Sequence, residues 1–413
     1  MTKYNLIIVT GFCLLLSVVQ AQENPDQIKL HRSEQLTLGV LVDDVIKSYP
    51  VYEELPARLE EAAKYDQKAS SLFADAASVE FRFKTGQIGN NDNLREYEAG
   101  VELPLWRFGE RSASKQVARG LELEANTFAA LIRWELTGAL RAAIWRIELT
   151  ADRVAKTEQA AQVSVDLLRS IQRRVELGTL PRSDLLQAKQ DKLNSDIRLS
   201  SARIERANAV RAYQIITEQQ VMPADFIESR SSKSGINEQH PALAHSSARL
   251  ERATAEQRLT TESGTANPAL LFGVRTERGG DDTSYEDSVG VSFSYPLGFG
   301  RHVNAARATA SAQAAAVRAE HRALRRQLVM NAHDAQRNLI GAEREYHLAR
   351  QKNELAQQHL AMSMRALELG EMNLMAFLLI KETAFDAEMG ASGKEIQWHS
   401  AIAEYNQAVG EQP

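Results

Sequence analysis

Residues 175–189 read Val-Glu-Leu-Gly-Thr-Leu-Pro-Arg-Ser-Asp-Leu-Leu-Gln-Ala-Lys, and residues 367–381 read Leu-Glu-Leu-Gly-Glu-Met-Asn-Leu-Met-Ala-Phe-Leu-Leu-Ile-Lys. The two stretches share Glu-Leu-Gly, a later leucine and the final lysine, and Gly370 lies 192 positions after Gly178. A glycine between two helical patterns is typical of a helix C-cap, because glycine adopts the left-handed conformation without steric cost. The recurrence predicts a tandem repeat in which each glycine joins two helices.

Long helical patterns flank both turns. We expect helices over 110–177 and 182–220 in the first half and over 301–369 and 373–409 in the second. These ranges are rich in Ala, Glu, Gln, Arg and Leu, which favour helix. The first range would form a helix about 100 Å long at 1.5 Å per residue. It must therefore pack on other long helices as a coiled coil or helical barrel. We expect Ser183 to cap the helix after the first turn.

A two-residue period replaces the helical period in four places. We expect strands at about 78–84, 96–106, 269–278 and 288–298. Within Val79–Lys84 the odd positions are apolar and the even positions are charged. Loops rich in Gly, Asn and Asp separate the members of each pair, so the strands form two hairpins. The second strand is about long enough to cross a bilayer when tilted.

These patterns divide the chain into residues 1–21, a first structural repeat over 22–225 and a second over 226–413. Residues 1–21 contain Lys3, an apolar run and a plausible cleavage site after Ala21, which is typical of a secretory signal peptide. An uncleaved anchor is the alternative. The only cysteine, Cys13, lies in that apolar run. A mature chain would then have no disulfide and no thiolate site.

Composition narrows the class of protein further. No stretch after residues 1–21 has 18 consecutive apolar residues, so no transmembrane helix is expected there. The chain has 54 acidic and 49 basic residues, and this balance gives no reason to expect a nucleic-acid partner. His240 and His245 are five apart and do not share a helix face. No metal site is expected.

The order of helix, hairpin, very long helix, leucine–glycine turn and helix resembles the TolC-like outer-membrane efflux proteins. The resemblance covers nearly all of the chain after the signal. It also rests on the strand ends Leu103-Pro104-Leu105 with Gly109 and Tyr295-Pro296-Leu297 with Gly300. It implies a mainly α fold with a small membrane β part. Three copies would share a twelve-stranded β-barrel, four strands per chain, in the outer membrane of a Gram-negative bacterium. Their helices would continue it as a long periplasmic α-helical barrel.

The number of strands in one chain is consistent with a homotrimer, because four strands cannot close a barrel and open edges cannot lie in lipid. The apolar face of each hairpin would meet outer-membrane lipid, and the polar face would line a wet lumen. The residues predicted for that lumen are Glu80, Arg82, Lys84, Glu98, Glu102, Arg275 and Ser292.

By the same resemblance, the two leucine–glycine turns form the periplasmic tip that contacts an adaptor protein. The residues predicted for this contact are Leu177, Gly178, Thr179, Leu180, Leu369, Gly370, Glu371 and Met372. The alternative is that each glycine serves only as a helix cap, and the two interpretations are compatible.

The family often closes the tip with acidic residues after the second turn, but Ala376 and Leu379 occupy those positions here. The matching residues of the first repeat are Asp184 and Gln187. An apolar constriction formed by Leu374, Met375 and Leu378 would replace the acidic ring, since apolar constrictions gate by dewetting. The favoured alternative is that these side chains form coiled-coil core.

The resemblance implies a passive conduit in a tripartite efflux system. Its partners would be a periplasmic adaptor (membrane fusion) protein and an inner-membrane pump of the RND type. The ending Tyr405–Gly410 is similar to the heavy-metal cation branch, while multidrug efflux and type I protein secretion stay open. No GxSxG, HExxH or phosphate loop occurs, so the sequence indicates neither an enzyme nor a cofactor. A periplasmic adaptor or structural coiled-coil protein is the alternative class, against which the two amphipathic hairpins argue.

Overall fold

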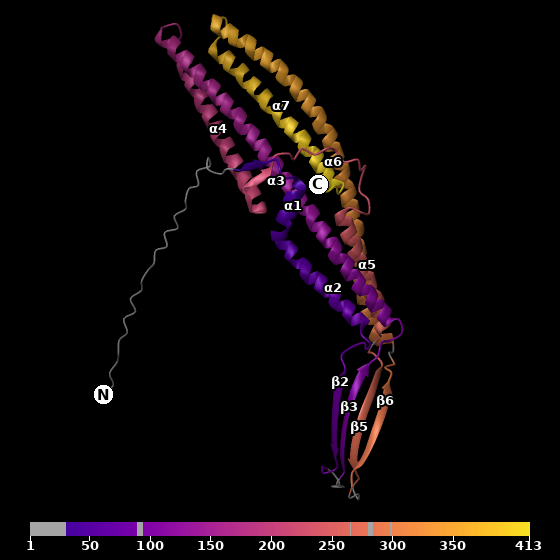
Figure 1. Cartoon of the computed structure of the whole chain (residues 1–413). Coiled ribbons are helices and arrows are strands. Elements are labelled where there is room, and N and C mark those ends of the chain that lie inside the picture. Colours follow the sequence, from indigo (N-terminus) through magenta and orange to yellow (C-terminus); the bar gives the residue numbers. More distant parts are fainter. Residues whose placement is uncertain (1–29, 89–93, 265, 280–283, 298–299) are drawn as a thin grey trace, which may run out of the picture.

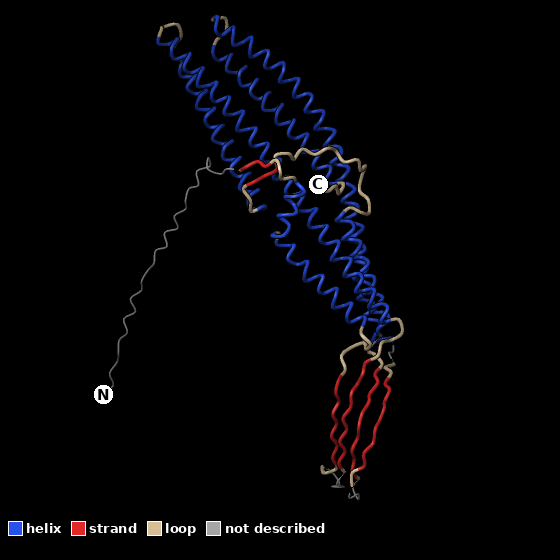
Figure 2. Tube along the Cα trace, viewed as in Figure 1, coloured by secondary structure: helices blue, strands red, loops and turns tan. Residues whose placement is uncertain are grey.

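The chain is elongated, with a helical region over most of its length and a small sheet at one end (Figures 1 and 2). A computed structural model describes residues 30–413 except 89–93, 265, 280–283 and 298–299. The predicted signal peptide, 1–21, lies outside the described residues. The elements of the first half are β1 (His31–Ser33), α1 (Leu38–Val45), two 3₁₀ turns (Ile46–Ser48 and Pro50–Glu53), α2 (Glu54–Ser70), β2 (Ser78–Thr85), β3 (Arg95–Pro104), α3 (Glu110–Glu176) and α4 (Arg182–Thr217).

The second half repeats the order of the first. Its elements are β4 (Val221–Pro223), α5 (Pro241–Ser263), β5 (Ala269–Arg278), β6 (Glu286–Ser294), α6 (Gly300–Leu369) and α7 (Leu374–Ala408). β6 ends four residues before the expected limit, because Pro296 has no N–H to donate to a sheet ladder. β4 lies just before the predicted boundary between the repeats at 225/226, and it pairs in parallel with β1.

The four long strands form one antiparallel sheet in the order β2-β3-β5-β6. One register row aligns Val79, Val101, Phe272 and Val291 across the sheet. Successive side chains of a strand point to opposite faces. The row therefore belongs to a continuous apolar face, and the intervening residues form a second face.

Two very long helices extend from the sheet to the far end of the molecule. α3 has 67 residues and α6 has 70. α3 packs against α2 and α5 in the half near the sheet and against α4 and α7 in the other half (Figure 1). α3 and α4 form one hairpin and α6 and α7 form the other, with both turns at the end opposite the sheet.

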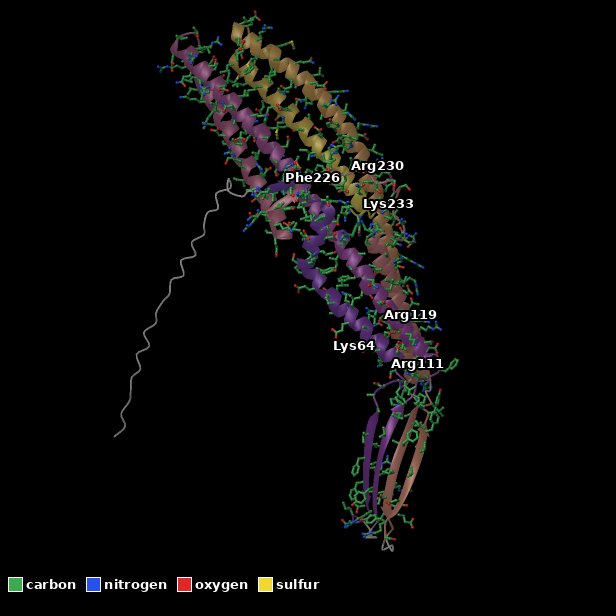
Figure 3. The ribbon with its side chains drawn as sticks, in the orientation of Figure 1. Lys64, Arg111, Arg119, Phe226, Arg230 and Lys233 are labelled. Atoms are coloured by element: carbon green, nitrogen blue, oxygen red, sulfur yellow. The ribbon has the colours of Figure 1, made fainter. Side chains whose placement is uncertain are left out.

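A side-chain contact joins two helices where the helical region meets the sheet. Figure 3 shows Arg111 and Arg119 in the part of the helical region close to the strands. Arg111 donates from Nη2 to the carbonyl of Ser70 at 2.7 Å and from Nε to that of Ala69 at 3.2 Å. These are terminal carbonyls of α2, which have no partner within the helix. The contact thus fixes the end of α2 on the start of α3.

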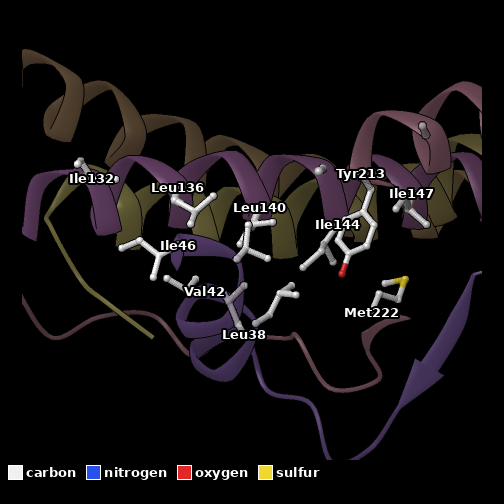
Figure 4. Close-up of a cluster of buried hydrophobic side chains, with 14 of the residues drawn as sticks. Leu38, Val42, Ile46, Ile132, Leu136, Leu140, Ile144, Ile147, Tyr213 and Met222 are labelled. Carbon is white, nitrogen blue, oxygen red and sulfur yellow. The ribbon is translucent and has the colours of Figure 1, made fainter. Parts of the chain in front are cut away.

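The largest hydrophobic cluster lies at mid-height, where α1 packs on α3 (Figure 4). Ile132, Leu136, Leu140 and Ile144 recur every fourth residue and are all buried, which is the spacing of one helix face. Tyr213 of α4 closes the cluster, and its hydroxyl donates to the carbonyl of Val221 at 2.8 Å. Burial raises the pKa of Tyr213. The cluster holds α1 and the β1–β4 pair on the long helices.

One cap differs from the expectation. Pro181 precedes α4 and no side chain caps that helix, so Ser183 is not its cap. Ser183 lies inside the first turn of the helix, because Arg182 already has helical geometry. In the second repeat, Asn373 caps α7 by accepting a hydrogen bond from the backbone N–H of Ala376 at 2.8 Å.

We expect Gly120→Ala to destabilise the protein. A Cβ at Gly120 would lie 2.9 Å from Cα of Arg252, so α3 and α5 would have to separate. Overpacking of this kind costs about 1–3 kcal/mol. Gly390→Ala is the matched control, because a Cβ there meets nothing within 4 Å and alanine favours helix by up to ~1 kcal/mol. Thermal unfolding followed by circular dichroism should show opposite shifts in Tm, and equal shifts would contradict the close α3–α5 packing.

Candidate functional site

Each helical hairpin ends in a turn built around a glycine in the left-handed conformation. Gly178 and Gly370 both have a φ of 77°. The N–H of Gly178 donates to the carbonyl of Val175 at 3.0 Å, and the N–H of Thr179 donates to that of Arg174 at 2.9 Å. The second turn has the same bonds, Gly370 to Leu367 at 3.2 Å and Glu371 to Ala366 at 2.9 Å. This is the Schellman pattern, and it confirms that both glycines are helix C-caps.

Most residues predicted for adaptor contact are exposed at these tips. The exposed ones are Leu177, Gly178, Thr179, Leu369, Gly370 and Glu371. The leucines are unusually open for apolar side chains, with Leu177 72% and Leu369 69% exposed. Leu180 and Met372 pack against a small core beneath the turns. They therefore support the tip and present less surface to a partner.

The residues predicted for the constriction also differ in their exposure. Leu374 is only 2% exposed and packs with Phe377 and Ile171 in the core beneath the tip. For Leu374 this burial agrees with the favoured alternative, in which the side chain is part of the core between helices. Met375 is 67% exposed. Asp184, Gln187 and Leu378 are half-buried.

A buried polar cluster that the sequence did not predict lies below this core. Nζ of Lys381 on α7 forms an ion pair with Asp191 on α4 and donates to Oγ of Ser164 on α3 at 2.9 Å. Ser164 is also hydrogen-bonded to Ser195 at 2.9 Å. The cluster joins the two hairpins. The only sequence signal was a lysine directly after the apolar run Leu374–Ile380.

A second ion pair lies beside this cluster. Arg198 of α4 donates from Nη2 to Oε2 of Glu382 on α7 at 2.9 Å. The hydrogen bond to Glu382 raises the pKa of Arg198. Removing one partner of a buried ion pair is strongly destabilising. Replacing either Lys381 or Asp191 would therefore leave an unpaired charge buried between the two hairpins.

The residues predicted to line a lumen all lie on one face of the sheet. They occupy even positions in β2, β3 and β6 and an odd position in β5, and the register brings these positions to the same side. Arg82 pairs with Glu98 at 3.1 Å and with Glu80 at 3.0 Å. Arg275 pairs with Glu96 at 3.0 Å. Glu96 was not among the residues predicted for the lumen. Exposed pairs contribute about 0–1 kcal/mol each, so their main effect is to order this polar face.

The two outer helices of the hairpins carry exposed apolar stripes. On α4 the stripe consists of Leu186, Leu193, Ile197, Ile204 and Ile215. On α6 it consists of Leu348, Leu355, Met362 and Leu369, spaced by seven residues. A seven-residue apolar repeat is the pattern of a coiled-coil contact. Each stripe thus has the pattern of a helix that lacks its packing partner.

Histidines do not assemble a metal site among the described residues. His240 is buried against Trp134, with ring centroids 5.0 Å apart, and His245 lies 5.6 Å from Phe128. Burial lowers the pKa of both imidazoles. The described part of the chain contains no group of three or more His, Cys, Asp or Glu placed to hold a metal ion. In the same residues, no helix has the length and apolarity needed to cross a membrane.

No protein-family profile and no curated protein sequence matches the chain. Solved structures do match. The outer membrane protein VceC of Vibrio cholerae has a TM-score of 0.74 at 14% identity, over 91% of this chain and 96% of that one. The CmeC outer membrane channel of Campylobacter jejuni has a TM-score of 0.72 at 14% identity, over 90% and 85%. CusC has a TM-score of 0.75 at 12% identity, over 95% and 96%. The chain therefore has the fold of these outer-membrane channels.

Proposed function

We propose that this chain is the outer-membrane channel of an efflux system, a passive conduit that three copies form together. The two-faced sheet is the observation that carries the proposal. Val79 is 80% exposed and Val289 82%, on the same face as Phe81 and Phe293. An exposed apolar face of this size is a liability in water and is suited to lipid. The opposite, charged face is suited to a wet lumen.

The open edges of the sheet support a trimer. Among the described residues, no strand pairs with the outer edge of β2 or of β6. Backbone N–H and C=O groups at such edges would be unsatisfied in lipid. Further copies of the sheet would pair with both edges and close a barrel. The α4 stripe of one copy would then pack against the α6 stripe of the next copy.

The exposed hairpin tips are proposed as the docking surface for a periplasmic adaptor. Leu177 and Leu369 lie on rigid, capped turns, and such preorganisation lowers the entropic cost of binding. The inner-membrane pump, of the RND type, would supply the energy. For the cargo we retain heavy-metal cations as the first candidate, with multidrug efflux and type I secretion as the alternatives.

A periplasmic adaptor or structural coiled-coil role is the competing class. Fractionation separates the two, because a channel would appear as a trimer in outer membranes and a soluble periplasmic monomer would contradict the proposal. A deletion strain tested against metal cations, drugs and secreted proteins, with plasmid complementation, identifies the cargo.

We expect Ile197→Arg on α4 or Leu355→Arg on α6 to reduce trimer formation strongly. A guanidinium in an apolar seam would be desolvated without a partner. Leu123→Arg is the control, since Leu123 is also an exposed leucine, at 41%, but lies on α3, outside both stripes. Chemical crosslinking and light scattering of detergent-solubilised protein report the oligomer. Trimers of normal yield in both stripe variants would contradict the α4–α6 contact.

We expect Gly178→Asp and Gly370→Asp to impair export while trimers still assemble. A Cβ at either turn has free space, but the positive φ strains any L side chain there, so the effect of charge is read from the difference between Asp and Asn. Asn at the same positions is the control, because it has nearly the same shape and tolerates the left-handed conformation. Complementation of the deletion strain measures export. Normal export by both Asp variants would count against docking at the tips.

A further inference from the structure

A groove with a cavity volume of about 450 Å³ lies between α3, α6 and α7 at mid-height. Its α3 residues include Trp134, Gly138 and Trp145. They lie on a different side of α3 from Leu136 and Leu140, which contact α1. The volume is within the range of about 300–1,000 Å³ that is usual for small-molecule sites.

Two tryptophans and a leucine supply the apolar walls. Trp145 is fixed between Phe226, at 5.1 Å with an edge-on geometry, and His399, which is stacked at 6.2 Å. Figure 3 shows Phe226 at this height of the molecule. The indole N–H of Trp134 donates to the carbonyl of Gln407 at 2.9 Å. Both rings are therefore held in place, with Leu328 of α6 beside them.

The floor of the groove is a hydrogen-bonded network. Gln407 donates from Nε2 to the carbonyl of Trp134 at 2.7 Å and accepts from Nη1 of Arg141 at 2.6 Å. Gly138 makes this possible, since a Cβ there would lie 2.7 Å from Nε2 of Gln407. Arg141 also binds both carboxylate oxygens of Glu228, at 2.7 and 2.6 Å. Its positive charge is thus neutralised within the protein.

Two further carboxylates line the groove. Glu135 comes from α3 and Glu404 from α7. Among the described residues, neither forms an ion pair with a Lys, Arg or His side chain within 4.0 Å. Glu404 accepts one hydrogen bond, from Oγ of Ser400 at 3.3 Å. Partial burial raises the pKa of Glu135. The groove therefore combines aromatic walls with negative charge that has no counter-ion in the structure.

We propose that this groove binds one amphipathic organic cation with aromatic or bulky apolar groups. The tryptophans would contact the apolar groups and attract the positive charge through cation–π interaction, which is strongest for Trp. Glu135 and Glu404 would supply the counter-charge. An anion of the same shape would meet the two carboxylates and bind poorly. Binding requires only the folded chain, so it does not depend on the proposed export function.

The test is isothermal titration of the purified full-length protein in a non-ionic detergent with tetraphenylphosphonium. Tetraphenylborate, which has nearly the same shape and the opposite charge, is the matched probe. We expect saturable binding of one phosphonium per chain and little binding of the borate. The double variant Glu135→Gln and Glu404→Gln should weaken phosphonium binding at least ten-fold. Glu122→Gln, which changes an exposed carboxylate of α3 outside the groove, should leave the affinity unchanged.

Three outcomes would overturn the proposal: no saturable phosphonium binding, equal binding of both probes, or equal affinity in the double variant and the wild type. The glutamate substitutions add no volume and lie at exposed positions, so a normal Tm is expected and is measured alongside. Because titration needs no transport, a negative result here leaves the conduit proposal standing. A soluble monomer that still binds phosphonium would overturn only the conduit.

Discussion

The hydrogen-bonding requirement of the sheet edges constrains the rest of the structure. A four-stranded sheet has two open edges, here on β2 and β6. One face of that sheet is apolar over most of its length, from the row of Val79 and Val101 to that of Phe83 and Tyr97, which is suited to lipid and unsuited to water. In lipid, however, unsatisfied edges cost several kcal/mol per polar group. Additional strands from other copies would satisfy both demands, and in the proposed trimer the exposed stripes on α4 and α6 would pack against each other.

Different contacts stabilise the helical region at mid-height and at the end opposite the sheet. The cluster around Leu136 and Leu140 fixes α1 on the long helices at mid-height. Near the far end, the Lys381–Asp191 pair joins the two hairpins, and the capped turns at Gly178 and Gly370 complete them. Near their tips the two hairpins are therefore held together by the small apolar core beneath the turns and by the buried Lys381–Asp191 pair.

The features predicted well from sequence are those set by local periodicity. The four strands and the helices α3, α4, α6 and α7 begin and end within four residues of the expected positions, because alternation and helical spacing are visible in the chain itself. The parallel β1–β4 pair was missed, since each strand has three residues and the partners are far apart in sequence. The pairing of Lys381 with Asp191 depends on which helix lies opposite, which no single segment shows. The groove at Trp134 and Trp145 is likewise a product of three helices.

Cysteine labelling along β2 tests the central claim most directly, since the claim is that one face meets lipid and the other meets water. Single cysteines replace Phe81, Arg82, Phe83 and Lys84 in a Cys13→Ser background, and intact outer membranes are treated with a charged, membrane-impermeant maleimide. The two-faced barrel predicts labelling at 82 and 84 and protection at 81 and 83, with the pattern reversed for a lipophilic maleimide. Equal labelling of all four positions by the charged reagent would show that both faces meet water, and it would contradict the channel.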